Sequence, residues 1–267
     1  KVIKGLERED LFTVVHEVVY TDTTDYADYI LPAPSFIETG DLFGSYGQYY
    51  IQMSEPAIKP IGESISNHEM FIRLAEKMGL KDASLTDSHE TVVNDLLKNR
   101  LDGKNHPNFK ELSDLKGHRI GPKRKENPFQ NGFFTPSGKI EFYSESMEKD
   151  GKDPLPAHVP LIEGSETEVL IKKYPLQLIL PPAHNFLNSS LGDVKNCIIG
   201  EGKPSLLIHP EDAKLRGVEE GDLVRVFNDR GEIFRYAKLG NRSLRGVAVS
   251  EGAWWAKLSP GGKGVNQ

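Results

Sequence analysis

Residues 166–267 alternate short apolar runs with glycine- and proline-marked corners, and this pattern restricts the fold more than any other feature of the chain. Pro210 begins one short helix and Gly217 ends it, in line with the preference for proline in the first helical turn and glycine beyond the last. Many short strands with a single short helix are typical of a small β-barrel. We therefore predict a mostly β domain with strands at 176–180, 206–208, 222–227, 232–239 and 246–250.

The first part of the chain has the pattern of an α/β domain. A helix is predicted at 2–9, and the nearly continuous apolar, β-branched run at 12–20 predicts a strand buried on both faces of a parallel sheet. The run ends in the polar loop 21–25, and ligands of α/β proteins usually bind where parallel strands end. The same hydroxyls and carboxylates would also cap a short helix, so both interpretations stay open.

Helical patterns follow this loop. Residues 66–69 form a capping box that predicts a helix ending at Gly79, and residues 87–90 predict the start of a second helix. The remaining expectations are a short hairpin between residues 34 and 60, a long surface excursion at 102–132, a hairpin at 133–143 and a linker at 150–168. We therefore expect two domains joined by this linker.

Charge and cysteine content exclude several classes of function. Lys and Arg number 33 against 39 Asp and Glu, a net charge of −6 that argues against nucleic acid or an anionic membrane as the main partner. No apolar run is long enough to insert directly into a membrane. Cys197 is the only cysteine, which excludes an internal disulfide, and an iron–sulfur cluster held by this chain alone. We expect it to be a buried thiol without chemical function.

Two loops carry groups suited to ligand binding. One spans residues 181–190 and offers imidazole, amide and hydroxyl groups directly after a strand, which suits a polyfunctional heterocycle and phosphates. The other, at 251–257, places two tryptophans beside an acid and a lysine, either as a core plug or as a wall against a planar ligand. The eight histidines show no HExxH spacing, and GxSxG is absent, so a zinc enzyme or serine hydrolase is poorly supported.

Taken in order, these segments resemble the C-terminal region of prokaryotic molybdopterin-containing oxidoreductases, the dimethyl sulfoxide reductase family. Residues 21–32 with Glu38 look like the family stretch T-x-T-A-x-x-A-D-V-V-L-P…E, and residues 137–141 look like its S-G-K-I-E hairpin. A third set of segments resembles the family's pterin-dinucleotide-binding domain and its final cofactor loops, at residues 208–213, 217–218, 221–224, 230–231, 246–255 and 265–266. The resemblance covers nearly the whole chain.

The resemblance implies a partial Rossmann-like α/β domain with helical and hairpin excursions at residues 1–165, followed by a mostly β double-psi β-barrel at residues 166–267. It implies that the barrel binds bis(molybdopterin guanine dinucleotide) carrying Mo or W, and that loops of both domains touch this cofactor. His209 stands where many members have asparagine. No catalytic or metal-ligating residue is expected within the chain. The cofactor-binding residues carried over are Thr21, Asp22, Thr23, Pro182, His184, Asn188, Ser189, Ser190, Glu251, Trp254 and Asn266.

The family's metal ligand and its iron–sulfur cysteines would lie upstream of Lys1. Both edges of the sequence look cut, so we expect a fragment of a longer enzyme that is inactive alone. Its expected partners are the rest of the same polypeptide and an iron–sulfur electron-transfer subunit. The cytoplasm is favoured as its compartment, with the periplasm as the alternative. The competing interpretation is a non-catalytic electron-transfer scaffold related to the large peripheral subunit of NADH:quinone oxidoreductase, which would have no need of polar ligand loops.

Overall fold

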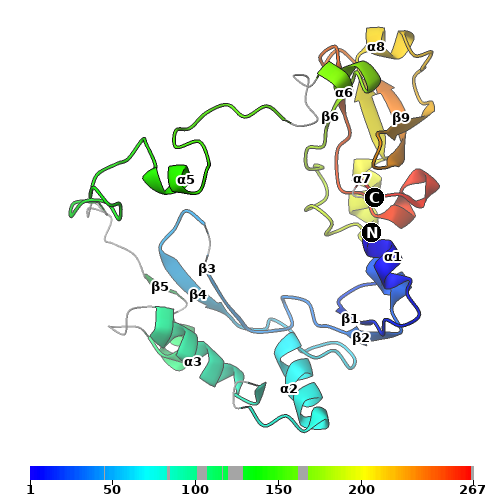
Figure 1. Ribbon diagram of the computed structural model, residues 1–267. Coiled ribbons are helices and arrows are strands. Elements are labelled where there is room, and N and C mark those ends of the chain that lie inside the picture. The colour runs from blue at the N-terminus through cyan, green and yellow to red at the C-terminus, as the bar shows by residue number, and fades with distance from the viewer. Residues whose placement is uncertain are drawn as a thin grey trace. The chain divides into compact units, whose positions relative to one another are not determined.

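The computed structural model describes residues 1–44, 46–82, 85–100, 107–115, 117–119, 129–161 and 168–265 (Figure 1). The chain divides into two compact units. The first unit comprises Lys1–Val19 and Tyr26–Pro154, and the second comprises Tyr20–Asp25 and Leu155–Gln267. The short segment at 20–25 therefore belongs with the C-terminal part of the chain.

The first unit contains helices and two small sheets. Its strands β1 and β2 are parallel, with Val14 opposite Tyr29, and β3, β4 and β5 form an antiparallel sheet. The hairpin expected between residues 34 and 60 is therefore present. The elements are α1 (Val2–Leu6), β1 (Val14–Glu17), β2 (Tyr29–Pro32), β3 (Asp41–Gly44), β4 (Tyr50–Ser54), α2 (Asn67–Met78), α3 (His89–Arg100), α4 (Phe109–Leu115), β5 (His118–Arg119) and α5 (Glu145–Lys149).

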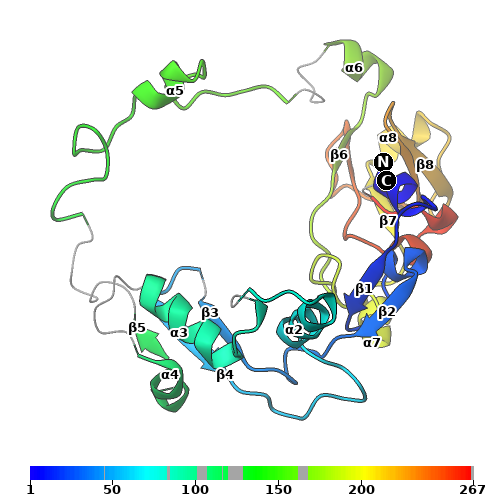
Figure 2. The same ribbon diagram turned by 60° about the horizontal axis from the view of Figure 1, so that its bottom comes forward.

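The helix boundaries follow the capping chemistry. Ser66 Oγ accepts a hydrogen bond from the Glu69 N–H at 3.2 Å, and Gly79 ends α2 in the left-handed conformation. Helix α3 begins one residue after Ser88, whose hydroxyl accepts from the Thr91 N–H. Both predicted helices are thus confirmed. Figure 2 shows α3 and α4 beside the β3–β4 hairpin, where a core forms from Val93, Leu97 and Leu112 with Leu42, Ile51, Met53 and Phe109.

Three expectations for this unit were wrong in part. The strand predicted at 12–20 is only the four-residue β1, and its residues are exposed or half-buried, because in the described chain it pairs with β2 alone. The segment 133–143 forms a turn without strands: Thr135 Oγ1 donates to the Lys139 carbonyl at 2.6 Å and closes a tight loop in place of a ladder. Within 102–132, Leu112 on α4 is fully buried, so that part is no surface excursion.

The second unit is built on a five-stranded mixed sheet in the order β6-β10-β7-β9-β8. Strands β8 and β9 form an antiparallel hairpin, and β7 and β9 are parallel. All the strands predicted for this region are confirmed with slightly shifted ends. Helices α6 and α7 had not been predicted. The elements are η1 (Thr23–Tyr26), α6 (Glu168–Lys173), β6 (Gln177–Ile179), α7 (Lys195–Glu201), β7 (Ser205–Ile208), α8 (Pro210–Lys214), β8 (Leu223–Phe227), β9 (Glu232–Leu239), β10 (Val247–Val249), η3 (Ala256–Leu258) and η4 (Pro260–Gly262).

One strand of this sheet buries a basic side chain, that of Arg235. Strand β9 alternates buried and half-buried residues, and its buried members are Ile233, Arg235 and Ala237. Arg235 is 0% exposed, with Nε donating to Ser250 Oγ at 3.1 Å and one terminal nitrogen unpaired within the described chain. Burial lowers the pKa of this guanidinium below its usual range.

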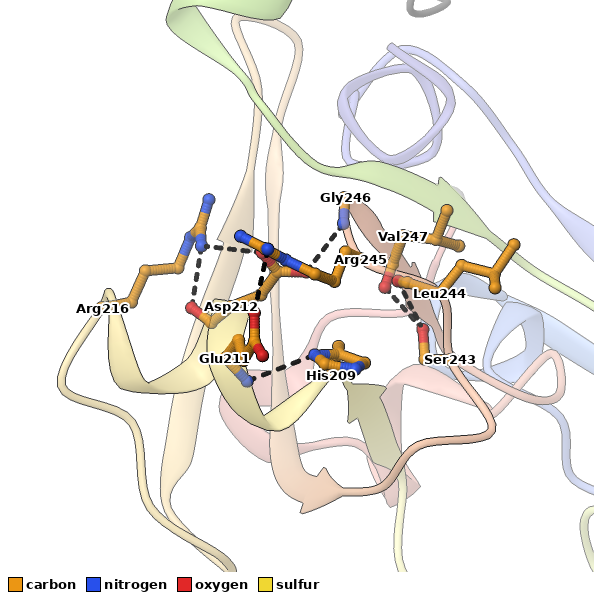
Figure 3. A network of polar contacts seen from close by, with 9 residues as sticks. All are labelled: His209, Glu211, Asp212, Arg216, Ser243, Leu244, Arg245, Gly246 and Val247. Carbon is orange, nitrogen blue, oxygen red and sulfur yellow. Dashed lines mark hydrogen bonds and ion pairs between the residues drawn. The ribbon is translucent and has the colours of Figure 1, made fainter.

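A polar network fixes α8 against the turn that precedes β10 (Figure 3). The buried Asp212 carboxylate accepts from the Gly246 N–H at 2.7 Å, and its neighbour Glu211 pairs with Arg245 at 2.9 Å. His209 Nδ1 accepts from the Glu211 N–H at 3.2 Å and so caps the helix, a task that asparagine performs equally well. The network therefore explains residue choices here without a ligand.

Glu232 connects the last described residues to the sheet. Its carboxylate accepts from Lys263 Nζ at 2.7 Å and from Arg225 Nε at 2.6 Å, and these two cations, Lys263 foremost, hold the pKa of Glu232 below its usual range. A depressed folded-state pKa means that the stability contributed by these ion pairs is present above the ordinary glutamate pKa of about 4.3 and is lost as the pH falls through the folded value.

We therefore expect the hydrogen-exchange protection factor of the Gly262 amide, which donates to the Ser259 carbonyl, to fall across this acidic interval. A Glu232→Gln variant should show the lowered protection factor both above and below this pH interval. Equal protection factors in the wild-type protein above and below the interval would contradict the dependence of this segment on the Glu232 ion pairs.

The architecture is mixed α/β, as predicted. In the described part of the chain, no helix combines the length and apolarity needed to cross a membrane. The division at residue 165 and the more specific fold descriptions stay predictions.

Candidate cofactor-binding loops

The loop after β6 ends in a tight turn that presents polar side chains. Leu187 and Ser190 form an isolated bridge, with the Ser190 N–H donating to the Leu187 carbonyl at 2.9 Å. Asn188 adopts φ 54°, a left-handed conformation that asparagine tolerates better than most residues. The side chains of residues 188–190 are exposed and make no hydrogen bond to described residues. This turn, which we call the 188–190 turn, therefore has free amide and hydroxyl groups.

A small apolar cluster supports the turn from the protein side. Phe186 and Trp254 pack edge to face with ring centroids 5.0 Å apart, and Ala183 completes the buried set. Cys197 and Ile198 of α7 pack against this cluster, and the cysteine is half-buried, less than the fully buried thiol that we predicted. The loop is thus fixed at residues 183 and 186, while residues 187–190 remain exposed.

Trp255 connects the two predicted ligand loops. Its indole Nε1–H donates to the Ser189 carbonyl at 2.7 Å, and Lys257 Nζ lies 4.8 Å from the indole centroid. Gly192 packs so closely that a Cβ added there would lie 2.8 Å from the indole Cε2. The indole is therefore held at its Nε1–Cε2 edge by both a hydrogen bond and close packing.

The 20–25 segment lies against the same loop. Asp22 accepts from the Ala256 N–H at 2.5 Å and from the Lys257 N–H at 3.3 Å, and Lys257 Nζ donates to the Tyr20 carbonyl at 2.7 Å. Thr24 is buried, and its Oγ1 donates to the Thr21 carbonyl at 2.6 Å, which closes the turn. A helix cap would accept a backbone N–H instead, so the capping interpretation of this segment stays a prediction.

The structure brings several predicted residues together. Asp22, Ser189 and Trp254 lie on one set of connected loops, whereas Asn266 lies outside the described residues. Trp254 is a core residue, and its direct contact with a cofactor stays a prediction. The remaining predicted residues are half-buried or exposed on these loops: Thr21, Thr23, Pro182, His184, Asn188, Ser190 and Glu251. Sequence reasoning placed Trp255 and Lys257 on the 251–257 loop, with the tryptophan pair as a core plug or a ligand wall, but counted neither among the cofactor-binding residues.

The donor groups suit a large polar ligand and not a bare metal ion. Among the described residues, no cluster of three or more His, Cys, Asp or Glu side chains is placed to hold a metal. Exposed amide, hydroxyl and imidazole groups at 184–190 are instead suited to hydrogen bonds with phosphates and a polar heterocycle. The loops therefore fit the pterin dinucleotide that the resemblance implies, with any metal ligand supplied from elsewhere.

Comparison with known proteins identifies the class. Residues 1–77 match a family model described as molybdopterin oxidoreductase, and residues 176–267 match one described as molydopterin dinucleotide binding domain. Acetylene hydratase from Pelobacter acetylenicus shares the fold with a TM-score of 0.73 at 24% identity, over 93% of this chain and 34% of that chain. The chain is thus built from regions of a molybdopterin oxidoreductase.

Curated relatives narrow the assignment. The chain is 42% identical to the probable oxidoreductase YoaE of Bacillus subtilis over 95% of its length and 36% of the relative. It is 30% identical to the dimethyl sulfoxide/trimethylamine N-oxide reductase of Cereibacter sphaeroides over 99% of this chain and 35% of that protein. Dimethyl sulfoxide reductase DmsA of Escherichia coli is 33% identical over 91% of this chain and 33% of that protein. The chain therefore belongs to the dimethyl sulfoxide reductase family, and it spans about a third of the length of these relatives.

Proposed function

We propose that this chain supplies part of the cradle for bis(molybdopterin guanine dinucleotide) in a longer Mo- or W-dependent oxidoreductase. Residues 1–165 would form the latter part of a Rossmann-like domain, and residues 166–267 a double-psi β-barrel. The observation that carries the proposal is the 188–190 turn: its polar side chains are free, and a buried aromatic cluster and the Trp255 indole hold it in place. Its position within a region that matches a dinucleotide-binding model supports the same conclusion.

The chain's own residues would bind and orient the cofactor. Asn188, Ser189 and Ser190 would donate hydrogen bonds to phosphate or pterin oxygens, and the exposed His184 and Glu251 would add further polar groups. Thr21 and Thr23 would contribute hydroxyl groups from the 20–25 segment. When bound, the group supplies two-electron chemistry, with oxo or hydrogen transfer to a substrate. The names of the sulfoxide and N-oxide reductases among the relatives favour oxo transfer.

The metal ligand, the iron–sulfur cluster and an electron-transfer subunit belong to this proposal as parts outside the chain. The scaffold interpretation receives less support, because relatives over nearly the whole chain are named as reductases or oxidoreductases.

Alanine substitution in the 188–190 turn tests the proposal. Asn188→Ala or Ser189→Ala should lower the affinity for the cofactor about 10-fold, since each removes one hydrogen bond to a charged group worth about 1.5 kcal/mol or more. The measurement is cofactor content per protein in the holoenzyme, after dialysis and at matched protein concentration, with thermal unfolding recorded in parallel.

Asn241→Ala provides the matched control, because Asn241 is exposed in the same unit but on a different turn. Its cofactor content should equal that of the wild-type protein. Unchanged cofactor content in the turn variants, with a lowered melting temperature, would contradict the proposed role.

A further inference from the structure

We propose that Asp22 is a positioning residue that holds the cofactor loops in their conformation through Trp255. The inference deepens the proposed function and rests on it. It assigns to the 20–25 segment a task other than direct contact: the Asp22 carboxylate fixes the backbone at residues 256–257, and this backbone places the indole that holds the 188–190 turn.

The Asp22 carboxylate is already engaged in the protein. Each of its two oxygens accepts a backbone N–H, from Ala256 at 2.5 Å and from Lys257 at 3.3 Å. Hydrogen bonds from amides to a carboxylate are charge-assisted and are about twice as strong as bonds between neutral groups. The residue is half-buried, which limits competition from water. Its geometry is therefore that of a support for the 256–257 backbone.

Lys257 strengthens the same connection in a second way. Its ammonium group donates to the Tyr20 carbonyl at 2.7 Å, two residues before Asp22, and it also lies 4.8 Å from the Trp255 ring centroid. One lysine thus joins the 20–25 segment to the indole face. Together, Asp22 and Lys257 hold both the backbone and the ring of the loop.

From the indole, the connection continues to the proposed binding turn. Trp255 Nε1 donates to the Ser189 carbonyl, so the orientation of the ring sets the position of the peptide whose side chains are free for the ligand. Asp22 and Ser189 are joined through one intervening residue pair, Trp255 and Ala256, without direct contact between them. Replacing Asp22 should therefore change the conformation of the 188–190 turn only while the Trp255 indole is present to connect the two.

Hydrogen exchange and tryptophan fluorescence test the support itself. In Asp22→Ala, the amides of Ala256 and Lys257 should exchange at least several-fold faster, while those of β9 stay protected and show that the fold is intact. The Trp255 emission, isolated as the difference from the corresponding Trp255→Phe protein, should shift to longer wavelength as water reaches the indole. Asp22→Asn keeps one acceptor oxygen and should retain protection at one of the two amides. Asp25→Asn is the matched control, because Asp25 is an exposed aspartate on the 3₁₀ turn that follows Asp22.

A double-mutant cycle tests the route to the cofactor. Trp255→Phe removes the indole N–H, and if Asp22 acts through it, then Asp22→Ala should lower cofactor content in the holoenzyme clearly in the Trp255 background and little further in the Trp255→Phe background. Fully additive losses would overturn the positioning role.

Two other outcomes distinguish a failure of this inference from a failure of the proposed cofactor-binding function. Unchanged exchange at residues 256–257 in Asp22→Ala would overturn the positioning role and leave the proposed function standing. Unchanged cofactor content in both Ser189→Ala and Asp22→Ala would overturn the proposed function, and the positioning role with it.

Discussion

Replacing Trp254 by alanine is expected to lower the free energy of unfolding by about 3–5 kcal/mol, the usual cost of removing a large aromatic side chain from a packed core. The indole is 5% exposed and packs edge to face on Phe186, with ring centroids 5.0 Å apart. The surroundings have little room to collapse into the space, because a Cβ at nearby Gly252 would already lie 2.8 Å from the Ala183 Cβ. Urea unfolding of the purified protein measures the loss.

Two variants show whether Trp254 acts as core or as a ligand wall. Trp254→Phe retains an aromatic ring and should lose clearly less stability than the alanine variant. Leu244→Ala removes a side chain that is 75% exposed in the same unit, and it should stay within about 0.5 kcal/mol of the wild-type protein. A Trp254→Ala protein as stable as the Leu244→Ala protein, but with reduced cofactor content, would identify a ligand wall instead.

Gly192→Ala should destabilise the protein by about 1–3 kcal/mol, the range expected when a methyl group is forced into a packed site. The new Cβ would lie 2.8 Å from Cε2 and 2.9 Å from Nε1 of Trp255. The indole cannot swing away freely, because its Nε1–H is hydrogen bonded to the Ser189 carbonyl at 2.7 Å. We therefore expect the hydrogen bond to be lost together with the stability, which urea unfolding and the NMR signal of the indole N–H report separately.

A smaller ring at position 255 should relieve this clash. The combined variant Gly192→Ala with Trp255→Phe should be more stable than the sum of the two single effects predicts, because the two side chains share one space. Gly5→Ala serves as the control, since a Cβ at Gly5 in α1 meets nothing within 4 Å. Strictly additive effects, or a Gly192→Ala protein as stable as Gly5→Ala, would contradict the packing described for Trp255.

Local sequence patterns predicted the five strands of the second unit and the helices that carry clear caps. Ser66 and Gly79 mark α2 because capping and left-handed termination are local chemistry, which a short window of sequence contains. The strand at 12–20 was predicted too long, since an apolar run does not reveal how many neighbours its strand will have. The segment 133–143 shows the opposite error: a turn formed, but side-chain bonds such as that of Thr135 replaced the ladder.

The sequence predicted only those parts of the candidate site whose side chains have a characteristic chemistry. Asn188–Ser190 stood out as polar groups after a strand, and the resemblance placed them in a cofactor loop. The contacts that hold the loops were not predictable, because they end on backbone atoms of distant residues. Trp255 reaches the Ser189 carbonyl across 66 positions, and Asp22 reaches the Ala256 amide across 234. Every residue has a backbone N–H and C=O, so such partners leave no signal in the sequence.

Metal and pterin analysis of the native protein that carries this chain tests the central claim most directly. Molybdenum and tungsten would be quantified by elemental analysis, and the pterin by the fluorescence of its oxidised form after release from the protein. We expect one of the two metals in stoichiometric amount together with the pterin. Iron without molybdenum, tungsten or pterin would contradict the cofactor-binding account and favour the electron-transfer scaffold.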